Sequence, residues 1–279
     1  MVDIRAMIAA QVRAITATRV ALALSGGIDS TGLLIALRAA GKEVDALTFR
    51  LAGTEPGDWT RARTSAATFG ATFVDVELPT DQDVLAADVR ALVRFGLRKK
   101  TAIECLWPMT YVIAASVERR HSVLVVGSCA DGHFGISKKA MMHYRQTVAG
   151  LDAFRARLFS DPDYAQVASL SRFASARGVE VVVPYRCQTI IDAFRGLRWE
   201  SINKPRQKEP IWAAFPEAAR ANVFRQHVNL QLGDSGIAAH FRTLLRIVPG
   251  AKSPVAVYNK MAREEAEGFD FDREGKTNE

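Results

Sequence analysis

Cysteine is scarce in this sequence, and its spacing argues against several kinds of site. The 279 residues include three cysteines, Cys105, Cys129 and Cys187, and no two of them form a CxxC pair. A zinc site, an iron–sulfur site or a disulfide framework needs closely spaced or paired cysteines, so we expect none of these. Such sparse cysteine is typical of the reducing cytosol, and we expect a cytoplasmic protein.

Long apolar runs are also missing. No stretch of about 18 uncharged apolar residues occurs, so we expect no transmembrane helix and no membrane partner. The N-terminal segment carries arginines throughout and lacks an apolar core followed by a small-residue cleavage site. We therefore expect no signal peptide.

Basic residues outnumber acidic ones, and the formal net charge is +7. This excess favours an anionic partner, either nucleic acid or a small anion such as ATP. A solvated basic surface explains the same excess, and we favour that explanation over nucleic-acid binding. Hydrophobic residues make up 48% of the chain and charged residues 24%, the composition of an ordinary globular protein.

Apolar runs of strand length alternate with helical stretches in the first half of the chain. Gly41 and Gly70 end two of these helices, as C-terminal caps do. Apolar strands separated by helices indicate a parallel sheet covered on both faces, which right-handed crossovers turn into an α/β doubly wound fold. The predicted strands are 19–24, 44–49, 71–78 and 121–126; the predicted helices are 30–40 and about 58–69, 81–95 and 107–119.

After residue 135 the pattern becomes mostly helical, with one short strand-like run at 179–183. We interpret this part as helices packed around the carboxyl ends of the strands. The sequence thus predicts one domain over 1–261, with a sheet core over about 18–135 and a helical part over about 136–261. The polar and mostly acidic residues 262–279 predict a flexible tail.

The first predicted strand runs directly into Ser25-Gly26-Gly27-Ile28-Asp29-Ser30, and a helix follows at once. Glycines let the backbone approach a phosphate closely, and a helix start directs N–H groups and its positive dipole end at an anion. Ser25 and Ser30 add hydroxyl donors. A carboxylate beside phosphates is repulsive unless a cation lies between them, so Asp29 implies Mg²⁺.

This loop fits neither the Walker pattern GxxxxGK[ST] nor the GxGxxG dinucleotide turn. It resembles the SGGxDS signature of the PP-loop ATP pyrophosphatases. The resemblance implies an adenine nucleotide α-hydrolase-like fold, and cleavage of ATP to AMP and pyrophosphate while a substrate is adenylated. A tight glycine turn with a Ser/Asp helix cap is the alternative, and we favour the nucleotide site.

A second turn follows the fourth predicted strand and ends in Gly135. Strand ends meet at one edge of a doubly wound sheet, so Asp131 in this turn can complete a Mg²⁺ shell with Asp29. The segment is similar to the SGEGADELFGGY motif of the asparagine synthetases and their β-lactam synthetase relatives. The matching residues are Gly127, Ala130, Asp131, Phe134 and Gly135.

Weaker similarities to the same family follow in the same order, so that the resemblance covers about residues 20–245. They lie at 107–111, 178–185 and 225–237. The sequence departs from the family at three positions that matter: Ser128 and Gly132 replace acidic residues, and His227 replaces a lysine.

The resemblance suggests Lys208, His227 and Ser128 as candidate catalytic residues. Glu104, Glu180 and His133 are alternatives for the base that Ser128 replaces. Lys208 lies where the family often has a helix lysine, within a basic cluster over 204–208 that a solvated helix start explains equally well.

Other residues at strand ends are candidates to contact ATP. Phe49 ends the second strand, where the adenine edge rests in this fold, although a core role is slightly favoured. Leu22 lines the base or fills the first strand. Val126 and Gly127 end the fourth strand and face the first loop.

The resemblance implies a ligase that uses ATP and Mg²⁺ to adenylate a carboxylate, releases pyrophosphate and forms an amide. Val2 stands where the family's glutaminase domain has its nucleophilic cysteine. Ammonia, another amine, or a separate amidotransferase or carrier partner would then supply the nucleophile. The alternatives are a tRNA- or DNA-modifying PP-loop enzyme and a nucleotide-binding protein without catalytic activity.

Overall fold

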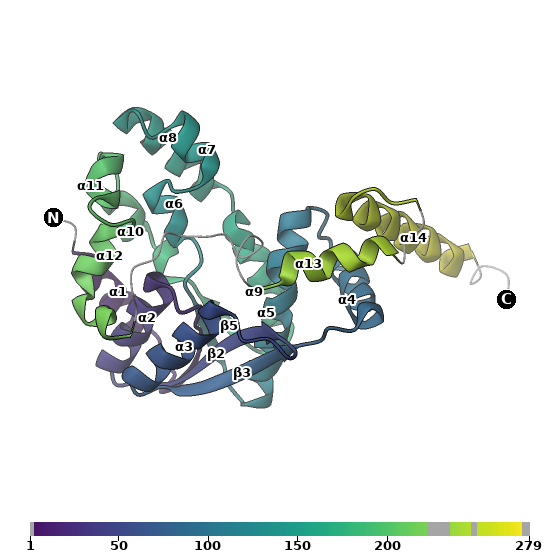
Figure 1. The fold of residues 1–279 in the computed structure, drawn as a ribbon, viewed down its shortest axis with the longest axis horizontal. Helices are drawn as coiled ribbons and strands as arrows, with labels where there is room; N and C mark the ends of the chain where they lie inside the picture. The colour runs from purple at the N-terminus through teal and green to yellow at the C-terminus, as the bar shows by residue number, and fades with distance from the viewer. Residues whose placement is uncertain (1–2, 222–234, 247–249, 275–279) are drawn as a thin grey trace.

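The computed structural model describes residues 3–221, 235–246 and 250–274, and a five-stranded parallel sheet lies at its centre (Figure 1). The strand order is β3–β2–β1–β4–β5. The strands are β1 Arg19–Ala23, β2 Glu43–Leu51, β3 Thr72–Leu78, β4 Val123–Val126 and β5 Glu180–Val182. The winding reverses between β1 and β4, and such a switch point is where doubly wound sheets bind ligands.

Alternate residues of the strands pack into two apolar clusters, one on each face of the sheet. In β1, Val20 and Leu22 belong to one cluster and Ala21 to the other, and all three are buried. This is the burial that a covered parallel sheet requires. The first cluster includes residues of α1 Ile4–Arg13, α2 Ile28–Ala39 and α3 Gly57–Thr68. The second includes residues of α4 Gln82–Arg94, α5 Lys100–Glu118, α9 Val167–Ser175, α13 Ile237–Arg242 and α14 Pro254–Glu274.

Further helices gather at the upper left of Figure 1, above α1 and α2. They are α6 Ala130–Phe134, α7 Lys138–His143, α8 Val148–Ser160, α10 Gln188–Ala193, α11 Trp199–Asn203 and α12 Glu209–Ala214. Short 3₁₀ turns link several elements: η1 Tyr164–Gln166, η2 Pro184–Arg186, η3 Pro216–Arg220 and η4 Thr243–Arg246. None of the described helices combines the length and apolar character that a membrane crossing requires.

The predicted α/β doubly wound fold is confirmed. The four predicted strands coincide with β1 to β4, and the strand-like run at 179–183 contains β5, which extends the sheet beside β4. One helix starts earlier than predicted: α5 begins at Lys100 rather than near Trp107. Pro108 suggested a helix start, but it lies inside the helix, whose preceding turns are anchored by the buried Ile103 and Leu106.

The predicted tail begins within a helix of the structure. Helix α14 continues past residue 262 to Glu274. Glu264 pairs with Arg90 at 2.7 Å, and Glu265 pairs with Arg94 at 3.1 Å, so the acidic residues dock against α4. Met261 and Tyr258 are buried one turn earlier, which explains why the polar segment remains helical at this boundary.

Candidate nucleotide site

The loop between β1 and α2 is held in shape by its own serines. The Ser25 backbone N–H donates to the Ser30 hydroxyl oxygen at 3.1 Å, and the two hydroxyl oxygens lie 3.0 Å apart. Ser30 also bonds the Gly27 carbonyl at 3.2 Å. Ser30 is buried whereas Ser25 is exposed, so Ser30 supports the loop and Ser25 is open to a ligand.

Gly26 is needed at its position for two reasons. Its φ is +69°, a conformation that side chains rarely adopt. A Cβ atom would also lie 2.7 Å from the Asp58 carbonyl oxygen and 2.7 Å from the Ala62 nitrogen, so α3 packs directly against the loop. Gly27 caps α2 without a side-chain hydrogen bond, which leaves the start of a buried helix to face an anion.

Asp29 and Asp131 converge on one lysine. The Lys208 ammonium forms ion pairs with Asp29 and with Asp131, the latter at 2.6 Å. Asp29 lies in the first turn of α2 and Asp131 in α6, which follows β4. The structure therefore brings together residues from three distant segments at the carboxyl edge of the sheet.

Lys208 is 5% exposed, and its charge is maintained by its partners. Burial alone would lower the pKa of the ammonium, but the Asp29 and Asp131 carboxylates together raise it above the ordinary value. Two carboxylates and one ammonium leave a local charge of about −1 at neutral pH. Polyphosphate therefore needs an additional cation to bind together with it at such a site.

The two carboxylates fit Mg²⁺. Oxygen donors from one or two carboxylates, completed by substrate phosphates, are what Mg²⁺ takes in nucleotide enzymes. The lysine shows that a single cation can contact both side chains. Within residues 3–221, 235–246 and 250–274, no set of three or more His, Cys, Asp or Glu side chains forms a metal cage. Asp29 and Asp131 would therefore hold the ion together with the phosphates.

Asn203 fixes the position of Lys208. Its side-chain oxygen accepts the Lys208 backbone N–H at 3.3 Å, and its amide nitrogen donates to the Phe134 carbonyl at 2.9 Å. Lys208 has a φ of +63°, a strained conformation for a residue with a side chain. Since Phe134 belongs to the same helix as Asp131, Asn203 joins the lysine to the helix that carries its partner.

Tyr185 links the helical part to the loop. Its hydroxyl donates to the Asp29 carbonyl at 3.0 Å. Burial, and then the neighbouring Asp29 carboxylate, raise the pKa of the phenol well above its ordinary value, so the hydroxyl keeps the proton it donates. The carbonyl of the same tyrosine lies 2.6 Å from Nε2 of His133.

The three alternative bases have other contacts or positions in the fold. His133 is fully buried between the rings of Phe159 and Phe194, and burial lowers its pKa to about 4, so the imidazole is neutral and donates from Nε2 to Tyr185. Glu104 is fully buried, with Tyr258 of α14 at 3.5 Å. Glu180 begins β5 and therefore lies at the amino edge of the sheet.

Gly127 lies beside the first loop, whereas Val126 is buried in the second apolar cluster. A Cβ atom on Gly127 would be 3.6 Å from the Ser30 backbone nitrogen, so the turn after β4 contacts the start of α2. Ser128 is half-buried in that turn, and Val126 is buried beneath it.

The remaining predicted residues are distributed differently. Leu22 has no exposed surface and packs in the first apolar cluster. Phe49 is half-buried at the edge of the second cluster, near the end of β2. His227 lies outside the described residues.

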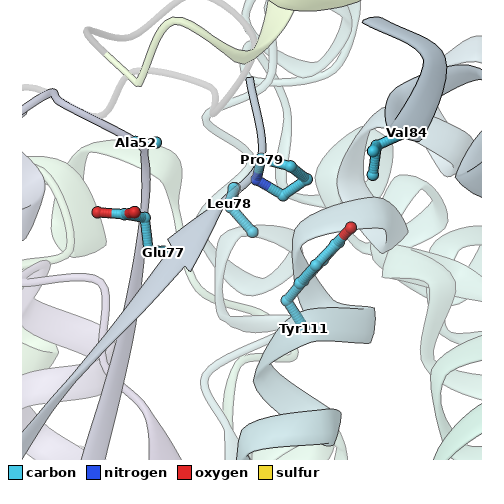
Figure 2. Close-up of a pocket in the computed structure, with 6 residues that line it drawn as sticks. All are labelled: Ala52, Glu77, Leu78, Pro79, Val84 and Tyr111. Carbon is cyan, nitrogen blue, oxygen red and sulfur yellow. The ribbon is translucent and has the colours of Figure 1, made fainter. Parts of the chain in front are cut away.

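A cavity of about 340 Å³ lies farther along the same edge of the sheet (Figure 2). Its lining residues come from the ends of β2 and β3 and from α4 and α5: Ala52, Glu77, Leu78, Pro79, Val84 and Tyr111. No residue of the Ser25–Ser30 loop lines it, so this cavity is separate from the candidate nucleotide site.

The contacts of Asn203 and Tyr185 with the site were not predictable from the sequence. Tyr185 lies in a segment similar to the asparagine synthetases, but that similarity gave it no role. Asn203 adjoins the basic cluster, and nothing in its local pattern marks it.

The sequence profile of the asparagine synthase family matches residues 3–160. The chain belongs to the asparagine synthase family. This match contains the loop, β4 and Asp131, whereas Lys208 and the weaker similarities beyond residue 160 lie outside it. ATP use is the activity that membership of this family indicates. No curated protein matches the chain in sequence.

Two solved structures are similar to this member of the family. The U34-tRNA thiolase NcsA from Methanococcus maripaludis, with its [4Fe-4S] cluster, is 14% identical over 92% of this chain and 78% of its own, with a TM-score of 0.45. A predicted subunit of a tRNA methyltransferase from Methanocaldococcus jannaschii is 13% identical over 86% of this chain and 91% of its own, with a TM-score of 0.36.

Proposed function

We propose that this protein is an ATP-dependent ligase that adenylates a carboxylate and then forms an amide. The convergence of Asp29, Asp131 and Lys208 beside the glycine loop carries this proposal. The loop suits a pyrophosphate, the carboxylates suit Mg²⁺, and the lysine suits a phosphoryl group that gains negative charge during transfer.

In the first step a substrate carboxylate oxygen attacks the α-phosphorus of ATP, and the bond to the β-phosphate oxygen breaks. Pyrophosphate leaves, and an acyl-adenylate remains. When bound, Mg²⁺ neutralises charge on the leaving pyrophosphate. The backbone N–H groups of residues 25–30 bind that group, and Ser25 donates from its exposed hydroxyl. Lys208 donates to the phosphoryl oxygens once these replace a carboxylate partner.

In the second step an amine attacks the acyl carbon, AMP leaves, and the amine loses a proton. Family membership does not identify the carboxylate or the amine. Ammonia is the simplest donor, and a partner protein that delivers it is an alternative. Because burial lowers the pKa of His133 to about 4 and its Nε2 is committed to Tyr185, we do not assign it as the base in this step.

Pyrophosphate release tests the proposal. Purified protein with Mg-ATP, a panel of carboxylic and amino acids, and ammonia should release pyrophosphate and AMP in equal amounts with at least one acid. Lys208→Ala should lower that rate by about 100-fold or more, because a donor to the transferring phosphoryl group is lost. Lys204→Ala, which removes an exposed lysine of the same cluster, should not. If no combination releases pyrophosphate, the ligase proposal fails.

A basic surface favours a second candidate function, modification of a nucleic acid. The hairpin of α7 and α8 holds five Lys and Arg residues over 138–160 against one acidic residue, Asp152, which pairs with Arg155. The other four cations, Lys138, Lys139, Arg145 and Arg157, are exposed.

Salt dependence tests this second candidate. Affinity for single-stranded RNA should fall with salt at a log–log slope of about −0.7 for each phosphate that is neutralised. Replacing both Lys138 and Lys139 with glutamine should make the slope shallower by about one unit or more. RNA binding that is absent, or unaffected by these changes, would leave a solvated surface as the explanation of the charge.

A further inference from the structure

We propose that Arg61 of α3 is a ligand of the β- and γ-phosphates of ATP. This inference rests on the proposed nucleotide site, and it adds a residue that neither the glycine loop nor the turn after β4 contains. It follows from how closely α3 packs against Gly26.

The backbone of α3 approaches the loop on the side that carries Arg61. A Cβ atom at Gly26 would lie 2.8 Å from the Arg61 Cβ, besides its contacts to Asp58 and Ala62. Gly26 is therefore required partly because the second turn of α3 occupies the space beside it. A guanidinium extends about four bonds beyond its Cβ, which makes the side chain long enough to reach a phosphate bound on this loop.

The side chain of Arg61 is directed toward the edge where a nucleotide would lie. Its guanidinium pairs with Asp58, which lies one turn closer to the start of α3. Helix α3 begins after the carboxyl end of β2, so this pair lies at the same edge of the sheet as the Ser25–Ser30 loop. The Arg61 side chain is 23% exposed, so it is only partly buried.

The balance of charge between the site and ATP favours a further cationic ligand for the phosphates. Asp29, Asp131 and Lys208 sum to about −1, and one Mg²⁺ raises this only to about +1, whereas ATP brings about four negative charges. A further cation at the loop offsets part of the negative charge that remains in the complex. The Asp58 carboxylate is 49% exposed, so its ion pair is weak and can be exchanged for a phosphate that accepts two guanidinium hydrogen bonds.

Binding of different phosphate ligands tests the role of Arg61. Calorimetric titrations with Mg²⁺ and ATP, with Mg²⁺ and pyrophosphate, and with AMP would compare wild type, Arg61→Ala and Arg61→Lys. Arg61→Ala should weaken ATP and pyrophosphate about tenfold or more, the usual effect of losing a charged hydrogen bond, and change AMP less than twofold. Arg61→Lys should recover part of the loss, since it keeps the charge without the planar fork.

Arg63→Ala is the matched control, because Arg63 lies on the same helix with its guanidinium over the Trp59 ring. It should leave all three affinities unchanged. Unchanged pyrophosphate affinity in Arg61→Ala overturns the inference, and so does an equal loss for AMP, which would mean that the loop itself is disturbed. If Arg61→Ala does not fold, Arg61→Gln provides the same comparison. Wild type that binds no ATP would refute the nucleotide site itself; wild type that binds ATP while Arg61→Ala matches it refutes only this inference.

Discussion

Lys208 stands between Asp29 and Asp131, the two carboxylates that the sequence assigns to a metal. The ammonium pairs with both, and Asn203 holds its backbone. A divalent ion that enters the same space must repel the ammonium or displace it. We therefore expect the protein without nucleotide to bind Mg²⁺ or Mn²⁺ weakly, and phosphates to be needed before the ion and the lysine can both be accommodated.

Replacing Lys208 with methionine tests this competition without any measurement of activity. Met has nearly the same length and no charge, so Asp29 and Asp131 become available to a metal. Electron paramagnetic resonance of free Mn²⁺ should show binding to Lys208→Met about tenfold or more tighter than to wild type in the absence of ATP. Lys204→Met, with the same charge change at an exposed site, should behave as wild type. Equal affinities for all three proteins would contradict the competition.

At the scale of elements, the sequence predicts much of what is local. The runs that became β1 to β4 are apolar and bounded by turn residues, so their positions were readable, as was the glycine loop that ends β1. The start of α5 and the continuation of α14 could not be predicted, because each depends on tertiary contacts. Burial of Ile103 stabilises the start of α5, and the pairing of Glu264 with Arg90 holds α14.

The residues of the site also divide into those that the local sequence predicts and those that tertiary contacts bring into place. Asp29 and Asp131 follow strands whose ends must meet, so their proximity could be predicted. Lys208 is 179 positions from Asp29, and only its resemblance to a family lysine suggested it. The Asn203 bridge depends on the positive φ of Lys208 and the packing of α6, which no local pattern encodes.

At the scale of the whole molecule, charge is buried at both ends of the sheet. At the amino edge, Asp45 accepts bonds from Arg19 at 2.6 Å, Arg119 at 2.7 Å and His121 at 3.0 Å. Burial lowers the pKa of His121 below its ordinary value of 6.5, against the opposing effect of Asp45. Its Nδ1 atom is buried without a hydrogen-bond partner among the described residues, so protonation would bury an N–H that no acceptor satisfies.

This arrangement predicts that acid destabilises the fold from about pH 6.5 downward. The unfolded chain protonates His121 more readily than the native state, so the free energy of unfolding falls as the pH drops from 6.5 toward the lower native pKa. Burial raises the pKa of Asp45, but its bonds to Arg119 and His121 outweigh this and lower it, so its contribution is lost only below about pH 3.8. Burial also lowers the pKa of His133 and of His240 below 6.5. Both histidines therefore add to the loss of stability that begins near pH 6.5.

His121→Gln separates the amino edge from the other histidines, because glutamine keeps a donor for Asp45 and does not titrate. Urea unfolding at pH 7.5 and 5.5 gives the free energy of unfolding at each pH. The difference between the two should be smaller in His121→Gln than in wild type, whatever the variant's stability at pH 7.5. His143→Gln, which replaces an exposed histidine, should keep the wild-type difference. A His121→Gln protein with the full wild-type difference would show that His121 gains no proton on unfolding, and the acid sensitivity would then belong to His133 and His240.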